Sequence, residues 1–133
     1  MTEETKLVFD QLKRALQRLE EAANKPVSAD RLEIDATIHR FEFTIELFWK
    51  ALKKKLLDDY GLEVNGPKPV LQQAYTYKLI NDEAIWLNML SDRNLTSHTY
   101  KEALANLIHQ NIKTYIPFLK KEFENVENNE SNN

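Results

Sequence analysis

Apolar residues recur every three or four positions along most of the chain, and this spacing predicts α-helices that each bury one face. The first predicted helix covers residues 3–23 and ends before Asn24-Lys25-Pro26, because proline cannot continue the hydrogen-bond ladder of a helix. Its apolar stripe consists of Val8, Leu12, Ala15, Leu16, Leu19 and Ala22. The stripe predicts that this helix packs against the rest of the chain along one side.

The second predicted helix is the longest. It starts near Ser28 or Asp30, either of which can cap a helix, and Asp30 with Glu33 has the spacing of a reciprocal cap. It ends at Tyr60, since Gly61 is suited to the left-handed conformation that stops a helix. Its apolar seam steps by three or four residues through Ile34, Ile38, Phe41, Ile45, Phe48, Leu52 and Leu56.

A second apolar set lies off that seam and contains Phe43, Leu47 and Trp49. Aromatic residues beside a core face are enriched where proteins contact one another, so Phe43 and Trp49 are candidate interface residues. The alternative is that a helix inside a bundle simply touches two neighbours. The sequence leaves both interpretations open.

Three further helices follow the turn cluster Asn65-Gly66-Pro67-Lys68-Pro69. We expect Pro69 at the first position of a short helix, and Asn81 as the cap of a helix from Asp82 to about Arg93. The apolar positions of these two helices are Val70, Leu71, Ala74, Tyr77 and Leu79, and then Ile85, Trp86, Met89 and Leu90.

The last predicted helix runs from Tyr100 to about Val126 and should bend at Pro117. Its expected apolar side consists of Leu104, Leu107, Ile108, Ile112, Tyr115, Leu119 and Phe123. Residues 127–133 contain nothing apolar to bury, and we expect them to form a disordered tail. The pattern therefore predicts one helical domain over residues 1–126.

Composition agrees with an all-α fold. The 133 residues include only two glycines and four prolines, so turn-rich sheet architectures are disfavoured. Without cysteine the chain can form neither disulfides nor thiolate metal sites. No apolar run reaches the roughly 20 residues of a membrane span and the first residues do not resemble a signal peptide, so we expect a soluble, cytoplasmic protein.

Charge and motif content exclude several kinds of site. The net charge of −3 does not favour nucleic acid over the whole surface, so any RNA contact must be local. The lysines at 53–55 suit such a contact, but a solvated helix face is the simpler explanation for them. His39, His98 and His109 have no paired metal-ligand spacing, and the chain lacks a glycine-rich phosphate loop. We expect neither a metal nor another cofactor.

Candidate chemistry gathers between Ser91 and Tyr100. Arg93 and His98 are five positions apart, which on an unbroken helix would turn them about 140° from each other. A break between them is therefore needed, and Thr99 with Glu102 has the spacing of a capping box that would start a new helix there. Tyr100 would then lie in the first turn of the last helix.

An arginine and a histidine together can cleave a phosphodiester without a metal. The imidazole can move a proton near neutral pH, and the guanidinium can stabilise charge on the phosphate oxygens. The alternative for Arg93 and His98 is a capping cluster at a helix end, with no chemistry.

Arg93-Asn94-Leu95-Thr96-Ser97-His98-Thr99-Tyr100 matches the pattern of HEPN domains: arginine, a polar residue, three more residues, histidine, any residue and tyrosine. More closely, the chain resembles the nucleotidyltransferase substrate-binding protein family within that superfamily. The resemblance extends from about Leu12 to Phe123 and is sharpest over residues 40–50 and 86–100.

The resemblance implies an up-and-down four-helix bundle with an additional short helix, which dimerises so that two motifs share one cleft. It also implies a partner, a minimal nucleotidyltransferase encoded by a neighbouring gene. In relatives of this kind the HEPN chain is a metal-independent RNase toxin, and the partner neutralises it by AMP transfer. By position, Arg93 would stabilise phosphate, His98 would move the proton, Asn94 would orient the pair and Tyr100 would accept AMP.

Two alternatives to the RNase interpretation stay open. The chain could be a non-catalytic subunit that presents substrate to the nucleotidyltransferase or docks on it. It could also be a helical bundle without chemistry, in which changes to the motif would alter only stability.

Overall fold

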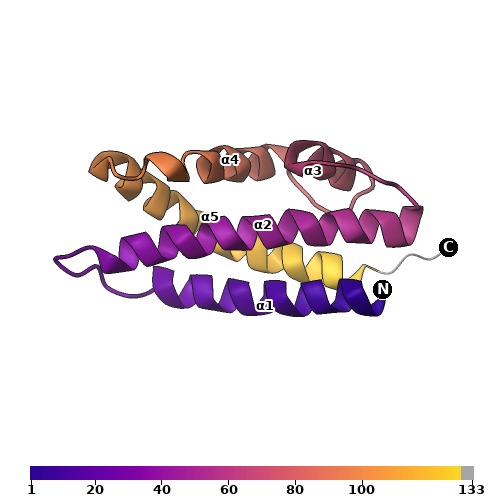
Figure 1. The fold of residues 1–133 in the computed structure, drawn as a ribbon, viewed down its shortest axis with the longest axis horizontal. Coiled ribbons are helices and arrows are strands. Elements are labelled where there is room, and N and C mark those ends of the chain that lie inside the picture. Colours follow the sequence, from indigo (N-terminus) through magenta and orange to yellow (C-terminus); the bar gives the residue numbers. More distant parts are fainter. Residues whose placement is uncertain (130–133) are drawn as a thin grey trace.

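The computed structural model describes residues 1–129, and within that range it contains helices and no strand (Figure 1). The elements are α1 (Glu3–Ala23), α2 (Leu32–Tyr60), α3 (Pro67–Thr76), α4 (Glu83–Asn94), the 3-10 turn η1 (Thr96–His98) and α5 (Glu102–Asn128). The predicted all-α fold is confirmed. Of the predicted tail, Glu127 and Asn128 still belong to α5, while residues 130–133 lie outside the described range.

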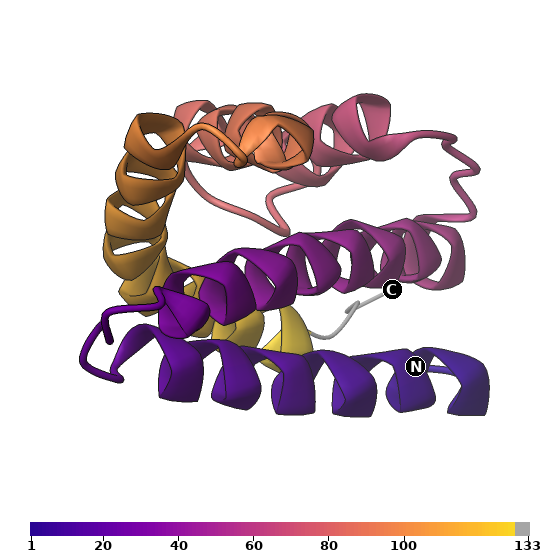
Figure 2. The ribbon, with the colours of Figure 1, turned by 60° about the vertical axis from the view of Figure 1, so that its left-hand side comes forward.

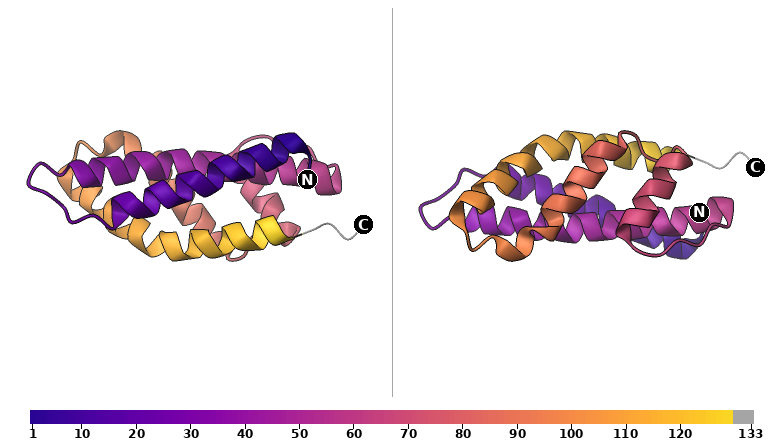
Figure 3. Two further views of the ribbon diagram at one scale, coloured as in Figure 1. Left: turned by 90° about the horizontal axis from the view of Figure 1, so that it is seen from below. Right: turned by 90° about the horizontal axis from the view of Figure 1, so that it is seen from above.

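The helices run up and down along a common direction. α1 and α2 form an antiparallel hairpin, and α3 and α4 follow one another along the side of α2 that faces away from α1 (Figures 1 and 2). α5 returns along the bundle and contacts both α1 and α2. Pro117 lies inside α5, where it removes one backbone hydrogen bond, and α5 follows a curved path in both views of Figure 3. α3 and α4 thus share the third position of a four-helix arrangement.

The predicted apolar seam of α2 forms the centre of the core, and all seven of its residues are buried. Aromatic side chains join the helices there: Phe48 meets Trp86 of α4 edge-on with ring centroids 4.7 Å apart, and Phe41 stacks on Tyr115 of α5 at 5.9 Å. Two predicted inward positions are wrong. Leu107 of α5 is 54% exposed, because the buried face of this turn is formed by Ala105 and Ile108, and Tyr77 is 37% exposed, because α3 ends one residue before it.

Four predicted helix starts differ from the structure, those of α2, α3, α4 and α5. α2 starts at Leu32, whose backbone N–H donates to the Asp30 carboxylate, while Glu33 reaches back to the N–H of Ser28 rather than to Asp30. α3 starts two residues before Pro69, at Pro67. The predicted reciprocal cap of Asp30 and Glu33 is therefore wrong: the residue before α2 is Arg31, and its side chain makes no capping hydrogen bond.

The cap of α4 is Asp82, which accepts a hydrogen bond from the N–H of Ile85, and not the predicted Asn81. Asn81 is instead held by Glu122 of α5, a carboxylate that is only 1% exposed. Glu122 accepts from the backbone N–H of Asn81 at 2.8 Å, from its side-chain amide at 2.8 Å and from Nε1 of Trp86 at 2.9 Å. This buried carboxylate ties the start of α4 to α5 and so positions the helix whose other end carries Arg93.

None of the helices in residues 1–129 is both long enough and apolar enough to cross a bilayer.

Candidate functional site

The predicted break between Arg93 and His98 is present. α4 ends at Asn94, η1 forms a single turn, and α5 starts at Glu102. The predicted capping box is wrong, because the hydroxyl of Thr99 donates to the carbonyl of Thr96 at 2.9 Å and α5 has no side-chain cap. Hydroxyl side chains often satisfy nearby backbone groups in this way instead of capping a helix. Tyr100 consequently lies ahead of α5, outside its first turn.

Arg93 lies against α2. Its Nη2 donates to Oε2 of Glu46 at 2.8 Å in an ion pair whose two side chains are each 33% exposed. Its Nη1 lies 3.4 Å from the amide oxygen of Asn94, a long contact between neighbours. The Nε atom is buried and has no hydrogen-bond partner among the described residues. The guanidinium is therefore held in one place with part of its donor capacity unused.

Three side chains contact the carboxylate of Glu46: Arg93, Trp49 and Lys50. Trp49 donates its Nε1 hydrogen to Oε2 of Glu46 at 3.1 Å, and the ammonium of Lys50 lies 3.4 Å from Oε1. Burial opposes ionisation of Glu46, but the hydrogen bond from Trp49 and the charges of Arg93 and Lys50 outweigh it and lower the pKa of its carboxyl below the usual value. Glu46 is thus a fixed anion that orients Arg93.

A second acid of α2, Glu42, lies one turn earlier on the same side of the helix. The hydroxyl of Thr96 donates to Glu42, and it also lies 2.7 Å from the carbonyl oxygen of Arg93. Residues four apart on a helix project from the same face. Glu42 and Glu46 together therefore hold the connection between α4 and α5 against α2.

Asp92 anchors the end of α4 on the other side. Its carboxylate accepts from the phenol of Tyr115 at 2.6 Å and from the side-chain amide of Asn111 at 3.1 Å, both on α5. Burial, together with this bond to Asp92, raises the pKa of the Tyr115 hydroxyl. Because Asp92 faces α5 while Arg93 faces α2, the last turn of α4 is wedged between the two long helices.

His98 and Tyr100 are presented differently, on the outside of the connection. His98 is exposed, and Tyr100 is 77% exposed, with the ring centroids 6.2 Å apart and the planes at 69°. No hydrogen bond or ion pair joins His98 to Arg93 within residues 1–129. The structure thus places Arg93 and His98 near the two ends of one short connection, and their roles, with that of Asn94, stay predictions.

The two candidate interface residues also differ. Phe43 is 56% exposed on the outer face of α2, while Trp49 is partly buried and engaged with Glu46. Sequence reasoning did not single out Glu42, Glu46 or Asp92 as site residues. The four-residue spacing of Glu42 and Glu46 next to aromatic positions was the available signal, but charged residues at that spacing also decorate any solvated helix.

Within residues 1–129 no group of three or more histidine or acidic side chains is arranged to hold a metal ion.

Comparison with known proteins places the chain in a family. The family described as nucleotidyltransferase substrate binding protein like matches residues 7–128. A curated relative named "Probable ribonuclease HepT", from Haemophilus influenzae, is 34% identical over 89 residues, which are 62% of this chain and 60% of the relative. The chain therefore matches only about three fifths of the length of that relative.

Two solved structures share the fold. A crystal structure of a protein from Thermus thermophilus is 39% identical, with a TM-score of 0.76, over 87% of this chain and 95% of the other. A Haemophilus influenzae structure, described as revealing the fold of a substrate-binding domain of a nucleotidyltransferase, is 22% identical with a TM-score of 0.63, over 92% and 96%. The helical break at Arg93–Tyr100 is thus found in a chain that belongs to the nucleotidyltransferase substrate-binding protein-like family.

Proposed function

We propose that this chain is the HEPN-type partner of a minimal nucleotidyltransferase and that it acts as a metal-independent RNase neutralised by AMP transfer to Tyr100. The observation that carries the proposal is the position of Tyr100, a 77% exposed phenol whose ring lies beside that of His98. A group attached there would lie next to the imidazole. The relative named as a probable ribonuclease supports the nuclease part.

In the cleavage step the 2′-hydroxyl of RNA attacks the adjacent phosphorus. The O2′–P bond forms, the P–O5′ bond breaks, one proton leaves O2′ and another reaches O5′. His98 would move these protons, and Arg93 would stabilise charge on the non-bridging oxygens, oriented by Glu46 and Asn94. Because Arg93 and His98 lie at opposite ends of the connection, we propose a homodimer in which two connections complete one cleft.

In the neutralising step the phenolic oxygen of Tyr100 attacks the α-phosphorus of ATP bound to the nucleotidyltransferase. The new bond joins AMP to the oxygen, pyrophosphate leaves, and the phenolic proton passes to a base or to solvent. The bound AMP adds negative charge and bulk two residues from His98. It would therefore occupy the space that the scissile phosphate needs.

The test is cleavage of single-stranded RNA by the purified chain in the presence of a chelator. We expect cleavage that is lost in His98→Ala and strongly reduced in Arg93→Lys, which keeps the charge but not the planar fork. Ser97→Ala is the matched control, because Ser97 lies in the same turn, is exposed and makes no side-chain hydrogen bond within residues 1–129. Equal cleavage by all four proteins would contradict the proposal.

Co-expression with the neighbouring nucleotidyltransferase tests the modification. Intact-mass measurement should show a gain of one AMP per chain, absent in Tyr100→Phe, and the modified protein should no longer cut RNA. An AMP gain that persists in Tyr100→Phe would place the modification elsewhere.

A second candidate function is a non-catalytic subunit that presents substrate to the nucleotidyltransferase or docks on it. The ion pair of Arg93 with Glu46 favours this function, since the guanidinium is already occupied by a carboxylate in the single chain. It predicts a stable complex with the nucleotidyltransferase and no RNA cleavage at any protein concentration.

A further inference from the structure

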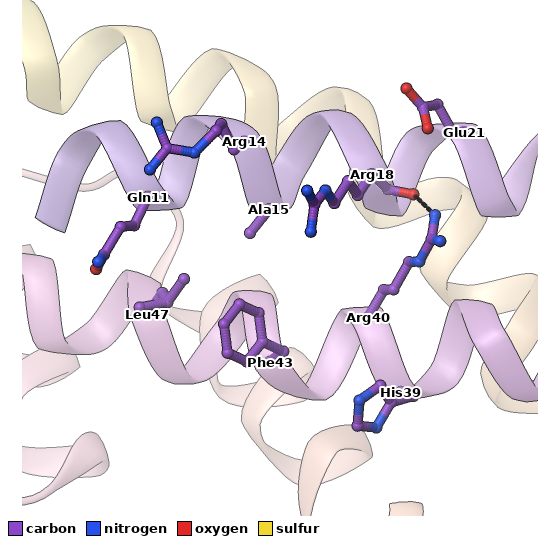
Figure 4. Close-up of a pocket in the computed structure, with 9 residues that line it drawn as sticks. All are labelled: Gln11, Arg14, Ala15, Arg18, Glu21, His39, Arg40, Phe43 and Leu47. Atoms are coloured by element: carbon purple, nitrogen blue, oxygen red, sulfur yellow. Dashed lines mark hydrogen bonds between the residues drawn. The ribbon is translucent and has the colours of Figure 1, made fainter.

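A groove of about 730 Å³ runs between α1 and α2 (Figure 4). Arg14 and Arg18 line it from α1, and Arg40 and Phe43 line it from α2. Its volume falls within the range of clefts that bind small molecules or single nucleotides, roughly 300–1,000 Å³. None of these residues belongs to the connection that carries Arg93 and His98.

The groove is positively charged although the whole chain is negative. Three arginines line it against one acid, Glu21, whereas the chain has a net charge of −3. The guanidinium groups of Arg14 and Arg18 form no ion pair or hydrogen bond with any of residues 1–129. Two of these cations are therefore available to an external anion.

Arg40 is fixed within the groove. Its Nη1 donates to the backbone carbonyl of Arg18 at 2.7 Å, which joins α2 to α1 across the groove (Figure 4). In the same view the Arg18 side chain extends over the groove, with Phe43 on the facing helix. Arg40 and Phe43 therefore share the α2 wall of the groove, and Arg14 and Arg18 face them from α1.

Phe43 supplies the second element of the site. Its side chain is 56% exposed, and it follows Glu42 directly in the chain and precedes Glu46 by three residues. Successive residues on a helix are turned by about 100°, so the exposed ring lies next to the face that holds the α4–α5 connection. A ligand that leaves the groove over Phe43 would approach Arg93.

We propose that this groove binds a segment of single-stranded RNA, with a base stacked on Phe43 and phosphates on Arg14 and Arg18. Stacking on an exposed aromatic ring beside a basic groove is the usual way in which proteins hold single strands without reading their sequence. The inference rests on the proposed RNase function and deepens it: an RNA strand bound in the groove would be positioned next to the connection between α4 and α5.

The test measures binding and cleavage separately, in the full chain. Binding is measured by anisotropy of a fluorescein-labelled single-stranded RNA of about 10 nucleotides, a length within the range that such surfaces cover. A His98→Ala background prevents cleavage during the measurement. The groove variants are Phe43→Ala and the double variant Arg14→Gln with Arg18→Gln. The matched control is Lys13→Gln with Lys121→Gln, which removes the same charge from exposed positions outside the groove.

We expect Phe43→Ala to weaken binding about tenfold, the effect of losing one stacked base. The arginine double variant should lower the slope of log affinity against log salt by about 1.4, since each lost phosphate contact on a single strand contributes about 0.7. The lysine control should lower both the RNA affinity and the salt slope less than the groove variants do. Cleavage by the same groove variants, with His98 intact, should fall in parallel with binding.

Several outcomes overturn the assignment. The first is that the groove variants bind RNA as tightly as the lysine control does. The second is that the protein binds ATP as tightly as it binds the oligonucleotide. The third is that the groove variants convert a dimer to a monomer in light scattering, which would make the groove a contact between two copies of the chain. The nuclease proposal is judged apart. RNA binding that depends on the groove, without cleavage, would support the groove as an RNA site and contradict the nuclease function. Cleavage that the groove variants leave unchanged would support the nuclease function and contradict the groove as an RNA site.

Discussion

Replacing Glu122 with alanine should be among the most destabilising single changes in this chain. Glu122 is buried and accepts hydrogen bonds from two donors of Asn81 and from the indole of Trp86. Alanine removes the acceptor and leaves those donors in place. The start of α4 would then lose its fixed attachment to α5, 36 residues or more away in sequence.

The loss in the free energy of unfolding depends on whether each of the three donors can find a new hydrogen-bond acceptor. Asn81 is an exposed residue, so its side-chain amide can return to water at little cost. The Nε1 of Trp86, whose side chain is 1% exposed, is left without that option, and the backbone N–H of Asn81, whose bond to Glu122 is partly buried, recovers only part of its hydration. At about 1–3 kcal/mol for each unsatisfied buried donor, the expected loss in the free energy of unfolding is about 4 kcal/mol.

Glu122→Gln is the matched control. Its carbonyl can still accept from the backbone N–H of Asn81 and from Trp86, and the Asn81 amide can rotate to present its oxygen to the new NH₂ group. Only the charge contribution is lost, about 1 kcal/mol.

Urea unfolding followed by circular dichroism at helical wavelengths measures both variants without relying on the fluorescence of Trp86. With a dependence of about 2 kcal/mol per molar urea, the midpoint should fall by about 2 M in Glu122→Ala and by about 0.5 M in Glu122→Gln. Equal midpoints for the two variants would refute the reasoning, because they differ mainly in whether the buried donors keep an acceptor.

Three further predictions concern single contacts. Because the pKa of Glu46 is lowered in the folded state, its contribution to stability is complete above about pH 4.5 and is lost as the pH falls through the lower folded value. Glu46→Gln should therefore flatten this part of a plot of unfolding free energy against pH, and an unchanged plot would contradict the lowered pKa. Gly61→Ala should lower the free energy of unfolding by about 1 kcal/mol through backbone strain alone, because φ is +63° and an added Cβ meets nothing within 4 Å. An unchanged urea midpoint would show that the left-handed conformation does not require glycine here. Tyr115→Phe should cost about 1 kcal/mol by removing the bond to Asp92, and spectrophotometric titration of the wild type should show one tyrosine that ionises well above pH 10, absent in the variant.

The sequence by itself determined the number of helices, most of their extents and the position of the break. Apolar periodicity, the proline after α1 and Gly61 are local signals, and a helix depends first on its own residues. The seam of α2 was predicted residue by residue because its apolar positions recur in steps of three and four over the whole length of the helix. The helix starts were less accurate, since Ser28, Asp30, Asn81 and Thr99 each had more than one possible hydrogen-bond partner nearby.

Only the tertiary structure decided which partner each polar side chain of the site has. Arg93 pairs with Glu46 across 47 positions, and Asp92 binds Tyr115 across 23. Such pairs depend on how each helix is rotated about its axis when the cores pack, and neither the spacing nor the composition of a single helix contains that information. The exposed position of Tyr100 has the same origin, because η1 precedes α5 and α5 starts only at Glu102, which leaves the phenol outside the bundle.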